Sequence, residues 1–240
     1  MENSSQAEAV IKATDSDLGF LLNSDGSRIS LVSEKGKGLS EEMTLPLCLI
    51  SLKGKIKKVV STVASSSLVD WAAKESNLKV IRTKVGQSSV THTMLAEEAK
   101  AGGEGNGGII NTDVHACRDS FTGMALILEY LACSYKSISQ LRQELPTYKM
   151  IKKKVKASFS DRKRIFNLIT SKFKQGQVNT EDGIRIDYPE FWLHVRPSNT
   201  EPVMRIIIDQ EAASLLKRKD YYLWVWKHKN EVYDVIKEKK

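Results

Sequence analysis

Residues 58–86 read KVVSTVASSSLVDWAAKESNLKVIRTKVG, and their apolar pattern is that of an α/β domain. The runs at 59–63 and 78–82 are rich in valine and isoleucine, which favour buried strands. Between the two runs, Leu68 and Trp71 recur at the spacing of one helix face. A strand, a helix and a second strand in this order predict a unit of a parallel sheet.

The sequence on the carboxyl side continues this alternation. Gly86 precedes a helical pattern, a glycine-rich loop follows at 102–108, and Asp119 precedes a long apolar helix that it can cap. One more helix ends at Pro146. We therefore expect residues 38–147 to form one α/β domain.

Residues 1–37 contain a short helical pattern and two strand patterns, at 18–22 and 29–32, joined by a polar loop. This is too little chain for a core of its own. Ser40 then has the residue type and position to cap the next helix. Pro46 is expected to interrupt that helix.

Residues 148–240 are expected to form a separate α+β domain. The lysine-rich run at 149–156 is either the boundary between the domains or an edge strand, because Ile151 and Val155 sit among its lysines. Ser160 is expected to cap a helix, and helical sequence continues to the carboxyl terminus. Strands are expected at 183–188, 191–195 and 203–208.

The composition restricts the class of protein. The chain has 240 residues, and 37 Lys and Arg against 29 Asp and Glu give a formal net charge of +8. This charge favours anionic partners, which include phosphorylated metabolites, nucleic acid and acidic membrane surfaces. The apolar stretches are far shorter than the roughly 20 residues that span a bilayer. The polar start does not resemble a signal peptide, so a soluble, cytoplasmic protein is expected.

The three cysteines, Cys48, Cys117 and Cys133, form no CxxC pair. They are expected to be reduced and mostly buried thiols, and they predict neither a disulfide framework nor a zinc site. His115 lies close to Cys117, but two ligands without partners at metal spacing predict local packing.

The glycine-rich loop at 102–108 reads GGEGNGG and carries one carboxylate, Glu104, and one amide, Asn106. It formally fits the GxGxxG dinucleotide fingerprint, which needs a strand before it and a helix after it. Here a helix-like segment precedes the glycines and Ile109-Ile110 follows, and Glu104 would repel a pyrophosphate. Both polar side chains can accept hydrogen bonds from hydroxyls, so the loop suits a sugar. The alternative is a solvent-exposed hairpin of flexible glycines.

Residues 196–202 read RPSNTEP. A guanidinium, two hydroxyls, an amide and backbone N–H groups of a turn can together surround a tetrahedral anion. These groups belong to Arg196, Ser198, Asn199 and Thr200. The segment therefore predicts a phosphate site, and the alternative is a polar turn between two strands.

In this order and with these flanks, the two loops resemble those of the α-D-phosphohexomutase superfamily, particularly its phosphoglucosamine mutase and phosphomannomutase members. Residues 102–108 are similar to the family's sugar-binding loop. Residues 196–202 with Arg205 are similar to the phosphate loop of its fourth domain. Residues 83–86 match a third-domain segment whose lysine, here Lys84, approaches the substrate.

The resemblance implies a fold in which only part of the four-domain family architecture is present. Residues 1–37 would be the carboxyl-terminal remnant of the second, metal-loop domain. Residues 38–147 would be the complete third, sugar-binding α/β domain, and residues 148–240 the fourth, phosphate-binding α+β domain. The whole is therefore expected to be an α/β protein.

The resemblance also implies a reaction, which is the transfer of a phosphoryl group between the C1 and C6 oxygens of a hexose phosphate. In the family a phosphoserine of the first domain donates the group, and a magnesium ion held by three aspartates of the second domain supports it. Glu104 and Asn106 would bind ring hydroxyls. The phosphate would be bound by Arg196, Ser198, Asn199 and Thr200.

The sequence departs from the family at two places. No segment resembles the first domain or its serine loop, and Ser65-Ser66-Ser67 is predicted to begin a helix. In the metal loop, Asn23, Asp25 and Ser27 stand at the three ligand positions and Arg28 follows. Because magnesium prefers anionic oxygen ligands, tight binding by this loop alone is not expected. Arg28 and Lys84 would only support catalysis.

Three hypotheses follow. The first is a phosphohexomutase-type protein that holds the phosphosugar but turns it over poorly or not at all by itself. The second is a non-catalytic phosphosugar-binding or assembly module, in which residues 1–37 dock on a separate chain carrying the serine domain. The third is nucleic-acid binding through Tyr221, Tyr222, Trp224 and Trp226 among basic residues. Helical packing of these aromatics is the favoured alternative, so neither nucleic acid nor membrane is an expected partner.

Overall fold

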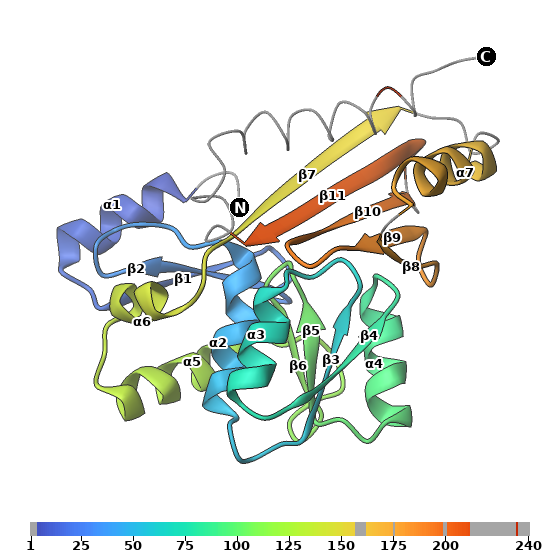
Figure 1. Cartoon of the computed structure of the whole chain (residues 1–240). Helices are drawn as coiled ribbons and strands as arrows, with labels where there is room; N and C mark the ends of the chain where they lie inside the picture. Colours follow the sequence, from blue (N-terminus) through green and yellow to red (C-terminus); the bar gives the residue numbers. More distant parts are fainter. Residues whose placement is uncertain (1–3, 157–161, 175, 199–200, 212–233, 235–240) are drawn as a thin grey trace. The chain divides into compact units, whose positions relative to one another are not determined.

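The chain divides into two compact units, Met1–Leu145 and Pro146–Lys240. The computed structural model describes residues 4–156, 162–174, 176–198, 201–211 and 234. Figure 1 shows the helices and strands of both units. None of the helices in the described ranges has both the length and the apolar character that crossing a bilayer requires.

Unit 1 begins with α1 (Ser5–Thr14) and an antiparallel hairpin of β1 (Leu18–Leu22) and β2 (Ile29–Ser33). Ile11 of α1 packs on Gly19 of β1, where a Cβ atom would lie 2.9 Å from Ile11 Cδ1. The helix and the two strands expected near the amino terminus are thus confirmed. They belong to the same compact unit as the sheet that follows them.

Four strands form the sheet of unit 1, in the order β4-β3-β5-β6. They are β3 (Lys58–Thr62), β4 (Lys79–Thr83), β5 (Ala101–Glu104) and β6 (Gly108–Asn111). β3 pairs in parallel with β4 and with β5, while β6 is antiparallel to β5. The carboxyl ends of the three parallel strands therefore meet at one edge of the sheet, where α/β proteins commonly bind ligands.

Helices cover both faces of this sheet (Figure 1). On one face, α4 (Gln87–Ala96) packs Val90 and Met94 against Val60 and Ile110 of the strands. On the other face, α2 lies against α3 and α5. The bounds of these and the last helix of the unit are α2 (Thr44–Ser51), α3 (Leu68–Glu75), α5 (Ser120–Ser134) and α6 (Ile138–Glu144). The α/β fold class is confirmed.

The prediction that Pro46 interrupts the first helix of the sheet domain is wrong. Ser40 accepts a hydrogen bond from the Glu42 backbone and begins a 3-10 turn, η1 (Glu41–Met43), which runs directly into α2. Pro46 lies in the first turn of α2, where a backbone N–H has no partner within the helix to lose. Burial of the helix, with Leu49 fully enclosed, stabilises this arrangement.

Unit 2 is an antiparallel sheet of five strands in the order β7-β11-β10-β9-β8. The strands are β7 (Tyr148–Lys156), β8 (Gln177–Asn179), β9 (Ile184–Asp187), β10 (Phe191–Pro197) and β11 (Val203–Glu211). The helix α7 (Arg162–Lys172) packs Ile165 and Ile169 on one face of the sheet, against Ile186, Val195 and Ile206. The α+β character expected of this part of the chain is confirmed.

The lysine-rich run at 149–156 is an edge strand. It is the β7 strand, and it pairs with β11 at nine positions. The short strand β8 was not expected, because three residues carry too little periodicity to be recognised. Ser160 and the helical sequence expected beyond residue 211, including its four aromatic residues, lie outside the described part of the chain, residue 234 excepted.

Candidate functional site

Glu104 ends strand β5 and its carboxylate is held from two sides. The side chain is only 8% exposed. Its Oε1 accepts a hydrogen bond of 3.1 Å from the backbone N–H of Gly86, which follows strand β4. Its Oε2 lies 3.2 Å from Nη1 of Arg118. A carboxylate has about four lone-pair sites, so two remain for hydroxyl groups of a ligand.

Arg118 is a site residue that the sequence did not reveal. Its Nε donates a hydrogen bond of 2.8 Å to Oε1 of Gln87, which fixes the guanidinium beside Glu104. The side chain crosses Gly108, where a Cβ atom would lie 2.4 Å from Arg118 Cδ. A single arginine next to a helix cap has no local signature, so only the fold could reveal this contact.

Asn106 uses its amide oxygen within the loop. The oxygen accepts a hydrogen bond of 3.1 Å from the Gly108 N–H, and because a backbone N–H can only donate, the side chain is oriented by this bond. The NH₂ group and the second lone pair of the oxygen of this half-buried amide remain for a ligand. Asn106 can therefore donate hydrogen bonds as well as accept them.

The loop is not the solvent-exposed hairpin of flexible glycines that was the alternative to a sugar site. Gly107 has φ of +82°, and a Cβ atom there would lie 2.1 Å from the carbonyl oxygen of Ile29. The Gly107 carbonyl also accepts the N–H of Ile29 at 3.0 Å, which joins the loop to β2. The segment that precedes the loop is the helix α4, as expected, and the first glycines, Gly102 and Gly103, lie in the strand β5 itself. Another strand, β6, follows, so the helix that the dinucleotide fingerprint needs is missing.

The residues at the expected metal-ligand positions are engaged in closing their own loop. Asn23 Oδ1 accepts the Arg28 N–H at 2.9 Å, and Asp25 Oδ1 accepts the Ser27 N–H at 3.0 Å. Hydrogen bonds from Ser27 lower the pKa of Asp25. One carboxylate, one amide and one hydroxyl do not fit magnesium, which needs anionic oxygens. In the described ranges no cluster of three or more acidic, histidine or cysteine side chains could replace them.

The two residues expected to support catalysis lie at different places in unit 1. Lys84 is exposed and directly follows β4, two residues before the Gly86 N–H that binds Glu104. It therefore shares the strand-end edge with the glycine-rich loop. Arg28 is half-buried at the start of β2, and its Nε is buried without a hydrogen-bond partner in the described part of the chain.

In unit 2, Arg196 lies near the end of β10 and is 8% exposed. Its Nη1 donates to the Pro197 carbonyl at 3.3 Å and lies 3.7 Å from Asp182 Oδ2. Asp182 also meets the buried His194, whose Nε2 lies 2.5 Å from the Asp182 carbonyl oxygen. Burial lowers the pKa of His194, which favours the neutral ring beside the guanidinium.

Ser198 begins the expected phosphate loop and is buried. Its N–H donates to the Val203 carbonyl at 2.8 Å, and its hydroxyl accepts a hydrogen bond of 3.3 Å from Nε of Arg205. Arg205 also pairs with Glu201 at 3.1 Å. The structure therefore brings two guanidinium groups to this turn, each with a carboxylate beside it. Asn199 and Thr200, also expected to bind phosphate, lie outside the described residues.

Known proteins share both the fold and much of the sequence. A family model described as "Phosphoglucomutase/phosphomannomutase, alpha/beta/alpha domain III" matches residues 35–148. A phosphoglucomutase/phosphomannomutase of Thermococcus kodakarensis is 34% identical over 88% of this chain and 47% of its own length. A "Probable phosphoglucosamine mutase" of Methanopyrus kandleri is 31% identical over 88% of this chain and 48% of its own length. A solved structure of a phosphoglucomutase/phosphomannomutase family protein from Burkholderia thailandensis is similar with a TM-score of 0.83 and 22% identity, and the match covers 99% of this chain and 50% of that one.

Residues 35–148 thus match the third domain of the phosphoglucomutase/phosphomannomutase family. The matched relatives extend the similarity over most of the chain, which belongs to the α-D-phosphohexomutase superfamily. The chain spans about half the length of the curated relatives it matches.

Proposed function

We propose that this chain holds a hexose phosphate for a phosphohexomutase reaction, the intramolecular transfer of a phosphoryl group between the C1 and C6 oxygens of the sugar. The observation that carries the proposal is the buried Glu104 carboxylate, fixed by Gly86 and Arg118 at the strand-end edge of unit 1. Its fixed orientation suits recognition of paired sugar hydroxyls, because a preorganised acceptor loses little entropy when the ligand binds.

In this proposal unit 1 carries the residues that recognise the sugar, and unit 2 carries the residues that recognise phosphate. Glu104 accepts hydrogen bonds from ring hydroxyls, and the Asn106 NH₂ group donates to one. Arg196 supplies bidentate geometry to the phosphate, assisted by the hydroxyl and backbone of the segment from Ser198 to Thr200. Lys84 and Arg28 are supporting cations that offset the negative charge of the phosphoryl group. All these residues contribute to the proposed reaction mainly by positioning the sugar phosphate.

The phosphoryl donor in the proposal is a phosphoserine from outside these 240 residues, because none of their segments resembles the family's serine loop. The serine would give its phosphoryl group to one sugar hydroxyl and regain one from the other end of the bisphosphate. Residues 1–37 would then be the end of the second family domain, residues 38–147 the third and residues 148–240 the fourth. The chain alone would bind hexose phosphates and turn them over slowly or not at all.

Magnesium takes no part in the proposed action of this chain, since the residues of the 23–28 loop do not fit it. The metal of the family reaction would have to be held mainly by groups outside these residues. A separate chain that carries the serine domain is the corresponding partner. Affinity purification of the tagged chain followed by mass spectrometry should recover such a partner, and recovery of the chain alone counts against it.

The direct test combines binding with turnover. Isothermal titration of the chain with glucosamine 6-phosphate, mannose 6-phosphate and glucose 1-phosphate should give saturable binding of at least one ligand. A coupled assay for the 1-phosphate or 6-phosphate product should give little or no turnover. The absence of binding for all three refutes the substrate class, and turnover like that of a complete mutase refutes the need for an external serine.

A further inference from the structure

A cluster of buried hydroxyl groups lies where strand β3 ends and α3 begins. Ser61 and Ser65 are fully enclosed, and Thr62 and Ser66 are 2% exposed. The Ser65 hydroxyl lies 2.9 Å from Ser61 Oγ and 2.9 Å from Thr62 Oγ1. The serine run was expected only to begin a helix, but Ser65 turns into the interior of unit 1, and the proposed function gives it no role.

The cluster binds the backbone on both sides of Glu104. Ser61 Oγ donates to the Gly103 carbonyl at 3.0 Å, and Ser65 Oγ accepts the Gly105 N–H at 3.0 Å. Both peptide groups that flank Glu104 are therefore fixed by side chains, one from β3 and one from the turn that follows it. Because the carboxylate is fixed separately by Gly86 and Arg118, the residue has anchors at its backbone and at its side chain.

The buried carboxylate of Glu42 closes the other side of Gly105. Its Oε2 accepts the Ser66 N–H at 3.0 Å, and the residue is 6% exposed. A Cβ atom at Gly105 would lie 1.9 Å from this oxygen, so a side chain there would require the Glu42 carboxylate to leave its hydrogen bond with Ser66. Glycine lets Glu42 and the serine cluster approach Gly105 closely, with the Gly105 N–H directed at Ser65.

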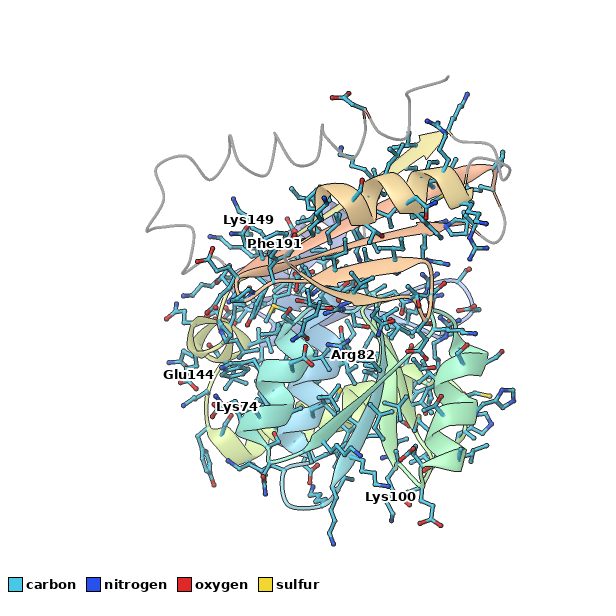
Figure 2. The ribbon with its side chains drawn as sticks, turned by 45° about the vertical axis from the view of Figure 1, so that its right-hand side comes forward. Lys74, Arg82, Lys100, Glu144, Lys149 and Phe191 are labelled. Atoms are coloured by element: carbon cyan, nitrogen blue, oxygen red, sulfur yellow. The ribbon has the colours of Figure 1, made fainter. Side chains whose placement is uncertain are left out.

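Arg82 holds the segment that carries the serines. Its Nη1 donates to the carbonyl oxygens of Thr62 at 2.7 Å and Ser65 at 3.4 Å, and its Nη2 pairs with Asp70. Figure 2 shows Arg82 far from Lys100, which lies at the opposite end of the same sheet, just before β5. Arg82 is therefore part of the strand-end edge that carries Glu104.

We propose that Ser65 is a positioning residue for sugar recognition: its hydroxyl, supported by Ser61, holds the Gly103–Gly105 backbone so that the Glu104 carboxylate faces the ring hydroxyls of the ligand. The inference rests on the proposed function, since it names how that site is built. Ser65 does not touch the ligand. Loss of its hydroxyl therefore affects sugar recognition through the loop and leaves phosphate recognition unchanged.

The test uses Ser65→Ala in the full chain, with Ser65→Thr to restore the hydroxyl and Ser88→Ala as the same substitution at an exposed position on α4. Amide exchange of Gly105, measured by NMR, should become about tenfold to a hundredfold faster in Ser65→Ala, because a buried donor loses its acceptor. Ser65→Thr should restore slow exchange, and Ser88→Ala should match the wild type. Should Thr not fit, Ser65→Cys keeps a weak acceptor and should give an intermediate rate.

Ligand titrations distinguish a positioning role of Ser65 from a merely structural one, because only a positioning role should change the affinity for the sugar and not that for phosphate. Ser65→Ala should weaken binding of glucosamine 6-phosphate about tenfold and leave binding of inorganic phosphate within twofold of the wild type. Unchanged Gly105 exchange in Ser65→Ala overturns the inference, as does equal weakening of both ligands. If the wild-type chain binds no sugar phosphate, the proposed function is wrong, and the exchange rates alone then decide whether Ser65 fixes the loop.

Discussion

Replacement of Gly107 by alanine should destabilise unit 1 more than replacement of any glycine whose surroundings are open. The residue has φ of +82°, and a Cβ atom would lie 2.1 Å from the Ile29 carbonyl oxygen. The left-handed conformation costs a residue with a side chain about 1–2 kcal/mol. The backbone of Ile29 must also move, and it makes two hydrogen bonds. Its N–H donates to the Gly107 carbonyl, and its carbonyl oxygen accepts from the Thr44 hydroxyl.

Each of these two bonds contributes about 0.5–1.5 kcal/mol. Alanine also lowers the conformational entropy of the unfolded chain, which raises the free energy of unfolding by about 0.4–1 kcal/mol. With the middle of each range, the net loss for Gly107→Ala is therefore about 3 kcal/mol. The matched control is Gly26→Ala, because Gly26 has φ of +64° and no heavy atom lies within 4 Å of its added Cβ. Only the conformational cost applies there, so the net loss is about 1 kcal/mol.

Urea titration followed through amide NMR signals of unit 1 measures both variants. With a slope of about 2 kcal/mol per molar urea, the Gly107→Ala midpoint should fall by about 1–2 M and the Gly26→Ala midpoint by about 0.5 M. Equal midpoints for the two variants would refute the close packing of the glycine-rich loop on β2.

Three further outcomes follow from the same structure. Burial raises the pKa of the Cys48 thiol. In the native chain, Ellman's reagent at pH 8 should therefore modify the two exposed cysteines, and it should modify Cys48 only after denaturation. Rapid modification of all three thiols in the native chain would contradict this. Hydrogen bonds from Thr122 lower the pKa of Asp119 in the folded chain. The stabilisation by the Asp119 carboxylate should therefore be present above about pH 3.9, the usual pKa of an unfolded aspartate, and should be lost as the pH falls through the lower pKa of the folded state. Asp119→Ala should therefore cost about 1 kcal/mol at pH 7 and almost nothing near pH 2 by urea unfolding, and a pH-independent cost argues against the cap. Calorimetry with Mg²⁺ should give no binding heat for the wild-type chain and a measurable heat for the Asn23→Asp, Ser27→Asp double variant; binding by the wild type would show that the loop rearranges.

The elements of the fold were largely predictable because their signals are local. The apolar runs at 59–63 and 78–82 place β3 and β4 within one residue of their observed bounds. Asp119 caps α5 as its residue type predicts. The interruption predicted at Pro46 was wrong because the effect of a proline depends on its position within the helix. Here the preceding 3-10 turn sets the start of α2, so that Pro46 lies in the first turn.

The candidate site residues could be proposed from the sequence, but their environment in the fold could not. Glu104 and Arg196 each lie in a motif of contiguous residues, which can be recognised in the sequence. The partners of Glu104 are 14 and 18 residues away, at Arg118 and Gly86, and the Ser65 contact to Gly105 spans 40 residues. Contacts at such separations depend on strand order, which the sequence pattern does not contain.

The most direct test of the central claim measures the dissociation constants of three ligands for the wild type, Glu104→Gln and Arg196→Met. The claim is that Glu104 recognises a sugar and that Arg196 recognises a phosphate. Both substitutions should weaken glucosamine 6-phosphate about tenfold to a hundredfold, the range expected for a lost charged hydrogen bond. Only Arg196→Met should weaken inorganic phosphate, and only Glu104→Gln should weaken glucosamine. If Glu104→Gln leaves glucosamine 6-phosphate binding unchanged, or weakens inorganic phosphate equally, the claim is contradicted.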